Sequence, residues 1–152
     1  PFVLIITTDI KHIEAQVVNK HNWQQAVNSL SRRGGIAVIA KNSMINHLNY
    51  TTTFNFDHTS FELVQATFIL EQRSAHFFFL YRSPLSTKNK LTESLFLEQF
   101  SNLLEYGNLI GGNLIILGDF NFHFDCPRKP CTSKLLDSSH VYNLKQSVSQ
   151  QT

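Results

Sequence analysis

The chain has 152 residues, of which 42% are hydrophobic and 16% are charged. This length suits one domain with a substantial core, and the composition excludes a disordered chain or a highly charged nucleic-acid-binding tail. The formal net charge of +2 is compatible with a polyanionic partner but is too small to predict one.

The two cysteines, Cys126 and Cys131, lie close together in a proline-flanked loop. Two thiols do not make the disulfide framework of a small secreted domain, and no Cys/His cluster with zinc-finger spacing accompanies them. Free intracellular thiols are therefore favoured over a local disulfide, which stays open as an alternative. The apolar opening PFVLIITTDI is too short to span a bilayer and lacks the features of a signal peptide. We therefore expect an intracellular protein without a membrane partner, and nothing in the sequence sets its oligomeric state.

The first part of the chain predicts strands separated by polar segments. Continuous apolar and β-branched runs indicate buried strands at residues 2–8 and 34–41. Residues 23–31, WQQAVNSLS, predict a weak helix between them. Residues 45–59 alternate loosely and are rich in Thr and Asn, which favours an edge strand and its turn.

The second part predicts a hairpin and then helices around a further strand. Residues 60–70 and 74–82 predict two paired strands, and residues 83–91 predict a loop. Residues 111–121 return to a buried strand, and residues 132–144 are typical of a short amphipathic helix. The sequence therefore predicts a mixed α/β sheet flanked by helices, with function at the carboxyl ends of strands.

Residues 92–108 carry the clearest helical pattern in the chain. Thr92 or Ser94 is suited to cap its beginning, and Gly107 is a plausible end.

Polar groups gather where the apolar run of residues 114–117 ends. Asp119 and Asn121 are two residues apart, so both side chains lie on the same face if the chain is extended. Asp119 is suited to take a proton from water or to bind a hard cation, and Asn121 to donate to a phosphate oxygen while accepting from water. The alternative is that GDFN is only a turn, since Gly, Asp and Asn are the favoured turn residues. On these four letters alone the turn is modestly favoured.

The neighbouring polar residues are ambiguous in the same way. Tyr81 and Arg82 end another apolar run, where a core tyrosine and a solvated arginine are the common case and a phosphate clamp is the alternative. His123 and Asp125 continue the alternation from Asn121, although a histidine held by a carboxylate is also a common structural pair.

Five motifs in order carry a resemblance to a known family: RRGGIAVI, SFELVQATFI, FFFLYRSP, FLEQFSNLLE and LIILGDFNFHFD. They resemble the endonuclease/exonuclease/phosphatase superfamily, and within it the endonuclease domain of non-LTR (LINE-type) retrotransposons. That domain has a Gly-rich entry to a strand, a Tyr-Arg-Pro-Pro-like strand end, GDFN-x-H-x-D and a later FLD helix, to which KLLDSSHVYNL is similar. The resemblance covers residues 34–144 and implies a partial four-layer α/β sandwich of mixed, mostly antiparallel sheets flanked by helices. It implies one truncated domain over residues 1–152.

The resemblance implies a metal-dependent phosphodiesterase that hydrolyses DNA, located in the nucleus if it is active. Asp119 would orient or deprotonate the attacking water, Asn121 would position that water and contact the scissile phosphate, and Tyr81 would hydrogen-bond the phosphate. Arg82 and His123 would contact the substrate. The implied cofactor is Mg²⁺, with Mn²⁺ as an alternative, which neutralises charge developing on the phosphoryl oxygens. Attack by water would leave a 5′ phosphate and a 3′ hydroxyl.

The sequence departs from the family pattern in its metal and proton-transfer groups. The family's metal-binding Glu ends the strand that FVLIITT resembles, and Thr7, Thr8 and Asp9 stand there instead. Asp9, one position out of register, and Asp119 are therefore the expected metal ligands. The family's earlier Asn-bearing strand and later Ser-Asp-His-like motif do not occur, and DSSH at residues 137–140 comes too early. Since each missing group contributes orders of magnitude to rate, we expect little or no catalysis by this chain.

Two other functions stay open on the same scaffold. One is a non-catalytic relic or interaction module that binds a partner through exposed strand edges. The other keeps catalysis but acts on phosphoinositides, sphingomyelin or nucleotide phosphates, because substrate choice lies in loops.

Overall fold

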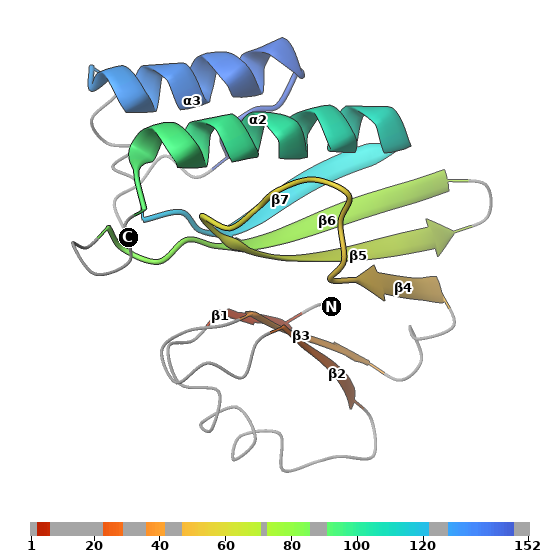
Figure 1. Cartoon of the computed structure of the whole chain (residues 1–152). Helices are drawn as coiled ribbons and strands as arrows, with labels where there is room; N and C mark the ends of the chain where they lie inside the picture. Colours follow the sequence, from red (N-terminus) through yellow and green to blue (C-terminus); the bar gives the residue numbers. More distant parts are fainter. Residues whose placement is uncertain are drawn as a thin grey trace.

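The computed structural model describes residues 3–6, 23–28, 36–41, 47–70, 73–85, 91–121 and 128–147. They form two β-sheets and two helices, which confirms the predicted α/β class (Figure 1). In chain order the elements are β1 (Val3–Ile6), β2 (Trp23–Asn28), β3 (Ile36–Lys41), β4 (Leu48–Thr51), β5 (Glu62–Leu70), β6 (Arg73–Tyr81), α2 (Glu93–Ile110), β7 (Asn113–Asp119) and α3 (Pro130–Val141).

The larger sheet has the strand order β4-β5-β6-β7 and is open. Its first three strands are antiparallel, and β6 and β7 are parallel, so the sheet is mixed and mostly antiparallel, as predicted. β5 and β6 pair from Glu62↔Tyr81 to Leu70↔Arg73, which confirms the predicted hairpin. A parallel pair needs a long crossover connection, and α2 supplies it between β6 and β7. As a result β6 and β7 end at the same edge of the sheet.

The smaller sheet has the order β1-β3-β2, with both pairs antiparallel. The helix predicted at residues 23–31 is wrong, because residues 23–28 form β2 and pair with β3 from Trp23↔Lys41 to Asn28↔Ile36. The helical pattern of WQQAVNSLS was weak, and pairing with an apolar neighbour strand overrides such a weak local preference.

Helix α2 begins where the sequence predicts and ends later. The Thr92 hydroxyl accepts a hydrogen bond from the Leu95 backbone N–H at 3.1 Å, which confirms the predicted cap. Gly107 does not end the helix: it is buried inside it, and a Cβ there would lie 2.7 Å from Leu114 Cδ2. Gly107 therefore permits the close approach of α2 to β7, and the helix ends at Gly111, whose φ is 67°.

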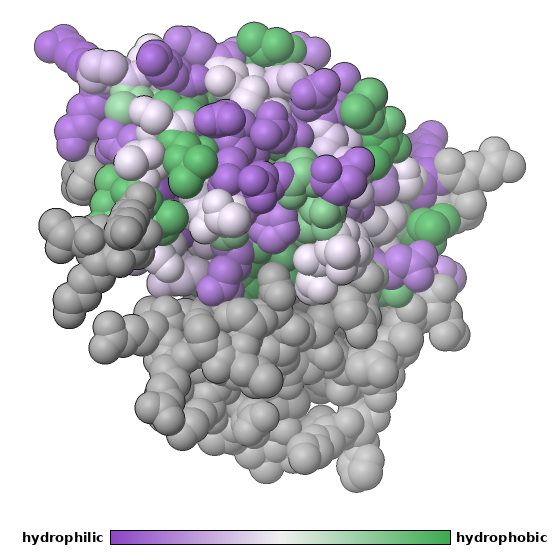
Figure 2. All heavy atoms as spheres, viewed as in Figure 1, coloured by the Kyte–Doolittle hydropathy of each residue, from purple (hydrophilic) through white to green (hydrophobic). Residues whose placement is uncertain are grey.

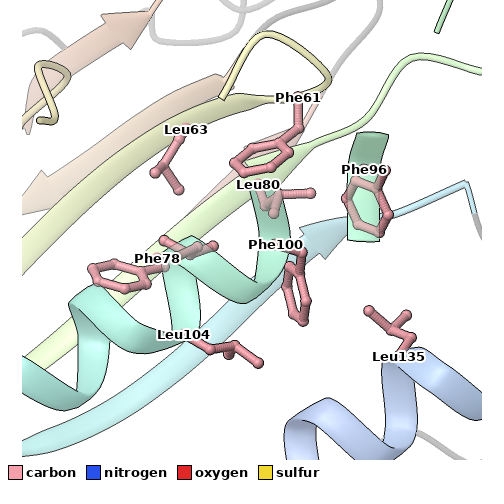
Figure 3. Packing of buried hydrophobic residues seen from close by; sticks show 9 residues of the cluster. Phe61, Leu63, Phe78, Leu80, Phe96, Phe100, Leu104 and Leu135 are labelled. Atoms are coloured by element: carbon pink, nitrogen blue, oxygen red, sulfur yellow. The ribbon is translucent and has the colours of Figure 1, made fainter. Parts of the chain in front are cut away.

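The main core lies between the larger sheet and α2, with α3 against it. Phe78 and Leu80 of β6 meet Phe96 and Phe100 of α2, and Leu135 of α3 points into the same cluster (Figure 3). No helix among the described residues is long and apolar enough to cross a membrane.

The opposite face of the larger sheet packs against the smaller sheet. Ile36 at the start of β3 is fully buried and clusters with Val64, Ala66, Phe79 and Tyr81. Since side chains alternate along a strand, β6 sends Phe78 and Leu80 to the helices and Phe79 and Tyr81 to the smaller sheet. The described residues thus build three layers: helices, larger sheet and smaller sheet (Figure 1).

Candidate functional site

The parallel register of β6 and β7 brings two predicted motifs together. Tyr81 pairs with Asp119 at the end of the ladder, and the Arg82 backbone N–H donates to the Asp119 carbonyl at 2.9 Å. Residues that are about 40 positions apart in the chain therefore form one edge, as parallel strand ends must. Tyr81, Arg82, Asp119 and Asn121 are the sequence-predicted site residues that the fold brings together at this edge.

Gly118 sets the distance between the two strand ends. Its φ is 149°, and a Cβ at this position would lie 1.8 Å from the Leu80 carbonyl oxygen. Only glycine fits such an approach of two backbones. The Gly of the GDFN motif is therefore required to bring Asp119 beside Tyr81.

Asp119 and Asn121 form a tight turn that leaves both side chains exposed. The Asn121 backbone N–H donates to Asp119 Oδ1 at 2.9 Å, and Asn121 adopts the left-handed conformation with φ 44°. Asn121 Nδ2 donates to the Arg82 carbonyl at 2.6 Å. GDFN therefore forms a turn, and this turn leaves the side chains of Asp119 and Asn121 accessible to solvent. The turn does not use the second carboxylate oxygen of Asp119, and it leaves Asn121 one N–H donor and one acceptor for a ligand.

Tyr81 and Asp119 belong to the face that looks away from the helices. The Tyr81 side chain is 5% exposed and packs in the cluster around Ile36. Asp119 is its register partner, so its side chain leaves the sheet on the same side.

Arg82 lies on the opposite, helical side and is turned inward. It is 1% exposed, and its guanidinium carbon lies 4.5 Å from the centre of the Phe96 ring. Its Nη1 donates to the carbonyls of Phe120 at 3.4 Å and Asn121 at 3.3 Å. Burial lowers the pKa of Arg82, and the charge of Glu93 opposes that shift. The sequence predicts Arg82 as a substrate contact, whereas the structure places its charged group beneath the turn.

Glu93 and Cys131 join this edge and are not recognisable from the sequence. A hydrogen bond with Glu93 raises the pKa of the Cys131 thiol, and burial adds to the effect. Glu93 opens α2 and Cys131 lies in the first turn of α3, so both helices begin at the edge where β6 and β7 end (Figure 1). Their proximity depends on helix packing, and no spacing in the chain signals it.

The remaining predicted residues, Asp9 and His123, together with Asp125, lie outside the described residues. Among the residues that the structure does describe, no three His, Cys, Asp or Glu side chains gather closely enough to hold a metal ion. At the exposed turn, Asp119 offers a carboxylate oxygen as a hard ligand. That is compatible with Mg²⁺, which commonly binds through one or two carboxylates, waters and substrate phosphate.

A second polar cluster lies beneath α2, in the middle of the sheet; we call it the His76 cluster and define it as Gln65, Thr67, His76 and Tyr106. Gln65 and His76 are 6% and 7% exposed. His76 Nδ1 lies 3.0 Å from Thr67 Oγ1 and 3.3 Å from Gln65 Nε2, and the Tyr106 hydroxyl donates to Gln65 Oε1 at 3.0 Å. Burial lowers the pKa of His76. These side chains bond mainly to one another, and within the described part of the chain His76 Nε2 is buried without a hydrogen-bond partner.

Exposed cations gather on α3 and its flanks. Arg128, Lys129, Lys134 and Lys145 are exposed there, against one exposed acid, Asp137. In Figure 2 hydrophilic residues cover much of the visible surface over the two helices, and apolar ones are scattered among them.

No family model matches the chain, and no curated protein sequence matches it.

Proposed function

We propose that the edge formed by Tyr81, Asp119 and Asn121 is the phosphate-facing part of a Mg²⁺-dependent phosphodiesterase site that acts on DNA. The observation that carries the proposal is the exposed Asp119–Asn121 turn, held beside Tyr81 by the parallel register and by Gly118. A carboxylate and an amide fixed on one turn are the groups needed to orient a water molecule against a phosphate.

The chain's own residues divide this task by their positions. Asp119 orients or deprotonates the attacking water through the carboxylate oxygen that the turn does not use. Asn121 accepts from that water and donates its second amide N–H to a phosphate oxygen. Tyr81, on the same face as Asp119, hydrogen-bonds the phosphate. Asp119 would hold a Mg²⁺ ion, which would neutralise the charge that develops on the phosphoryl oxygens. The reaction leaves a 5′ phosphate and a 3′ hydroxyl.

The charge on α3 supports DNA as the polyanion. Arg128, Lys129 and Lys134 lie in or beside the first turns of α3, and Cys131 between them reaches Glu93 at the candidate edge. Exposed cations at this place are suited to contact backbone phosphates flanking the cleaved bond.

The first test locates the cation. We expect Mn²⁺, a paramagnetic substitute for Mg²⁺, to broaden the backbone amide signals of Asp119 and Asn121 selectively. Asp119→Asn should abolish the broadening, and Asp57→Asn, which changes an exposed acid of the loop before β5, should leave it unchanged. Broadening centred away from Asp119 in the wild-type chain would contradict the proposed metal position.

The second test measures cleavage of supercoiled plasmid with Mg²⁺. Because the described residues provide an incomplete ligand set, we expect slow nicking, which Asp119→Asn reduces to the level of the protein-free reaction. Nicking that persists unchanged in Asp119→Asn would reject Asp119 as the catalytic group.

A non-catalytic interaction module is the second candidate, and one feature of β7 favours it. β7 is one of the two edge strands of the larger sheet as the structure describes it, and Ile115 and Leu117 are 40% and 37% exposed on it. An open edge with exposed apolar side chains is suited to pairing with another chain. Saturable protein binding without any response to Mn²⁺ or DNA would favour this candidate over the phosphodiesterase.

A further inference from the structure

We propose that Arg82 is a positioning residue, which fixes the turn carrying Asp119 and Asn121 from inside the protein and does not bind the substrate phosphate. The inference rests on the proposed function, because it assigns the turn a catalytic task. The juxtaposition that carries it is a buried guanidinium lying beneath the backbone of an exposed pair of polar side chains.

Arg82 contacts all three residues of the turn, and the contacts run in both directions. Its backbone N–H donates to the Asp119 carbonyl, and its Nη1 donates to the carbonyls of Phe120 and Asn121. In return Asn121 Nδ2 donates to the Arg82 carbonyl at 2.6 Å. The side chain of each of these two residues thus holds the backbone of the other. Such a reciprocal clamp is suited to stabilising the left-handed Asn121, a conformation that a non-glycine residue adopts at a cost.

The guanidinium is itself covered by α2, and α3 contacts the same turn of α2. The Phe96 ring covers it from the first turn of α2, and the charge of Glu93 in the same turn opposes the cost of burying a cation. Cys131 hydrogen-bonds Glu93 from the first turn of α3. The orientation of the turn therefore depends on how α2 and α3 pack.

Lysine is a poor substitute at this position for a geometric reason. A guanidinium is planar and carries several N–H donors, so it can lie flat on Phe96 while reaching two adjacent carbonyls. An ammonium is a strongly hydrated point charge that cannot do both.

The consequence is a defined orientation of the Asn121 amide. One of its two N–H donors is committed to the Arg82 carbonyl, which leaves the carbonyl oxygen and the other N–H available to water and phosphate. Without the Arg82 guanidinium the carbonyls of Phe120 and Asn121 lose their donor, so the turn is no longer held against residue 82 and the Asn121 amide loses its fixed orientation.

The test begins with the unmodified chain and follows side-chain N–H exchange by ¹⁵N NMR. We expect the Arg82 Nη1–H and one Asn121 Nδ2–H to exchange at least about tenfold more slowly than the Nη–H groups of Arg73, an exposed arginine at the other end of β6. Exchange of the Arg82 Nη1–H as fast as that of the Arg73 Nη–H groups would overturn the proposal without any variant.

Variants then separate positioning from phosphate binding. In Arg82→Lys and Arg82→Met we expect the Asn121 amide protection to be lost at temperatures where the β5–β6 amides stay protected, while Arg73→Met leaves it intact. Asn121 protection that survives in Arg82→Lys, together with weaker binding of a short DNA duplex, would identify Arg82 as a phosphate ligand and overturn the proposal.

Failure of the proposed function gives a different pattern. In that case Mn²⁺ and DNA leave the signals of the wild-type turn unchanged. The Arg82-dependent protection of Asn121 is read without either ligand and still reports whether Arg82 positions the turn.

Discussion

Two polar clusters of the larger sheet differ in the partners of their hydrogen bonds. In the His76 cluster, side chains bond to side chains beneath α2. At the strand ends, the side chains of Arg82 and Asn121 bond mostly to backbone, which leaves the Asp119 carboxylate exposed. A gathering of polar residues therefore does not by itself indicate a reactive site. The strand ends are the candidate because Arg82 and Asn121 hold the turn through backbone contacts while the side chains of Asp119 and Asn121 are exposed.

Among the substitutions that test the difference between the two clusters, Gly118→Ala is expected to have the largest effect on stability. The new Cβ would collide with the Leu80 carbonyl, so β7 must separate from β6 at the strand ends. We expect the free energy of unfolding to fall by about 4 kcal/mol, with the Asp119 turn lost before the His76 cluster. Denaturant unfolding measures the free energy, and amide hydrogen exchange of β6 and β7 shows which of the two regions opens first.

Gly111→Ala is the matched control for this substitution. Gly111 also has a positive φ, of 67°, but a Cβ there has no neighbour within 4 Å. We expect a loss of about 1 kcal/mol from the left-handed conformation alone. Equal losses in the two variants would show that the contact with Leu80 does not hold the strand ends together.

Tyr106→Phe is expected to have an intermediate effect, confined to the His76 cluster. It removes the hydroxyl that donates to Gln65 Oε1 and leaves a buried acceptor without that partner. We expect a loss of about 1–2 kcal/mol in unfolding free energy, and no change in the exchange of the Asn121 side-chain amide. A changed Asn121 signal would mean that the two clusters are coupled through α2.

The smallest expected effect is the pH dependence that His76 contributes. Its folded pKa is lowered by burial, so between that value and the ordinary value of about 6.5 the unfolded chain binds a proton that the folded chain does not. Stability from this source is complete above pH ~6.5 and is lost as pH falls through that window.

Comparing His76→Gln with the wild-type chain isolates this contribution, because the other titrating groups are common to both. We expect the difference in unfolding free energy between pH 7.5 and pH 5 to be smaller in the variant. An identical difference in the two chains would indicate that His76 takes up its proton equally in both states.

Local sequence patterns predict much of the fold. The alternation and apolar runs of residues 60–82 predict the β5–β6 hairpin, and Thr92 predicts the start of α2, because strand pairing and helix capping depend on residues close in the chain. The prediction of a weak helix at residues 23–31 is wrong because β2 forms through its pairing with β3, a partner strand that the local sequence does not reveal.

At the candidate site, the local sequence shows a carboxylate and an amide two residues apart at the end of an apolar strand. Their neighbours in space follow from the tertiary structure. The parallel register placed Tyr81 beside Asp119, and the packing of two helix starts turned Arg82 inward beneath the turn. Which face a side chain takes and which distant backbone it meets are set by long-range packing, which no local spacing encodes.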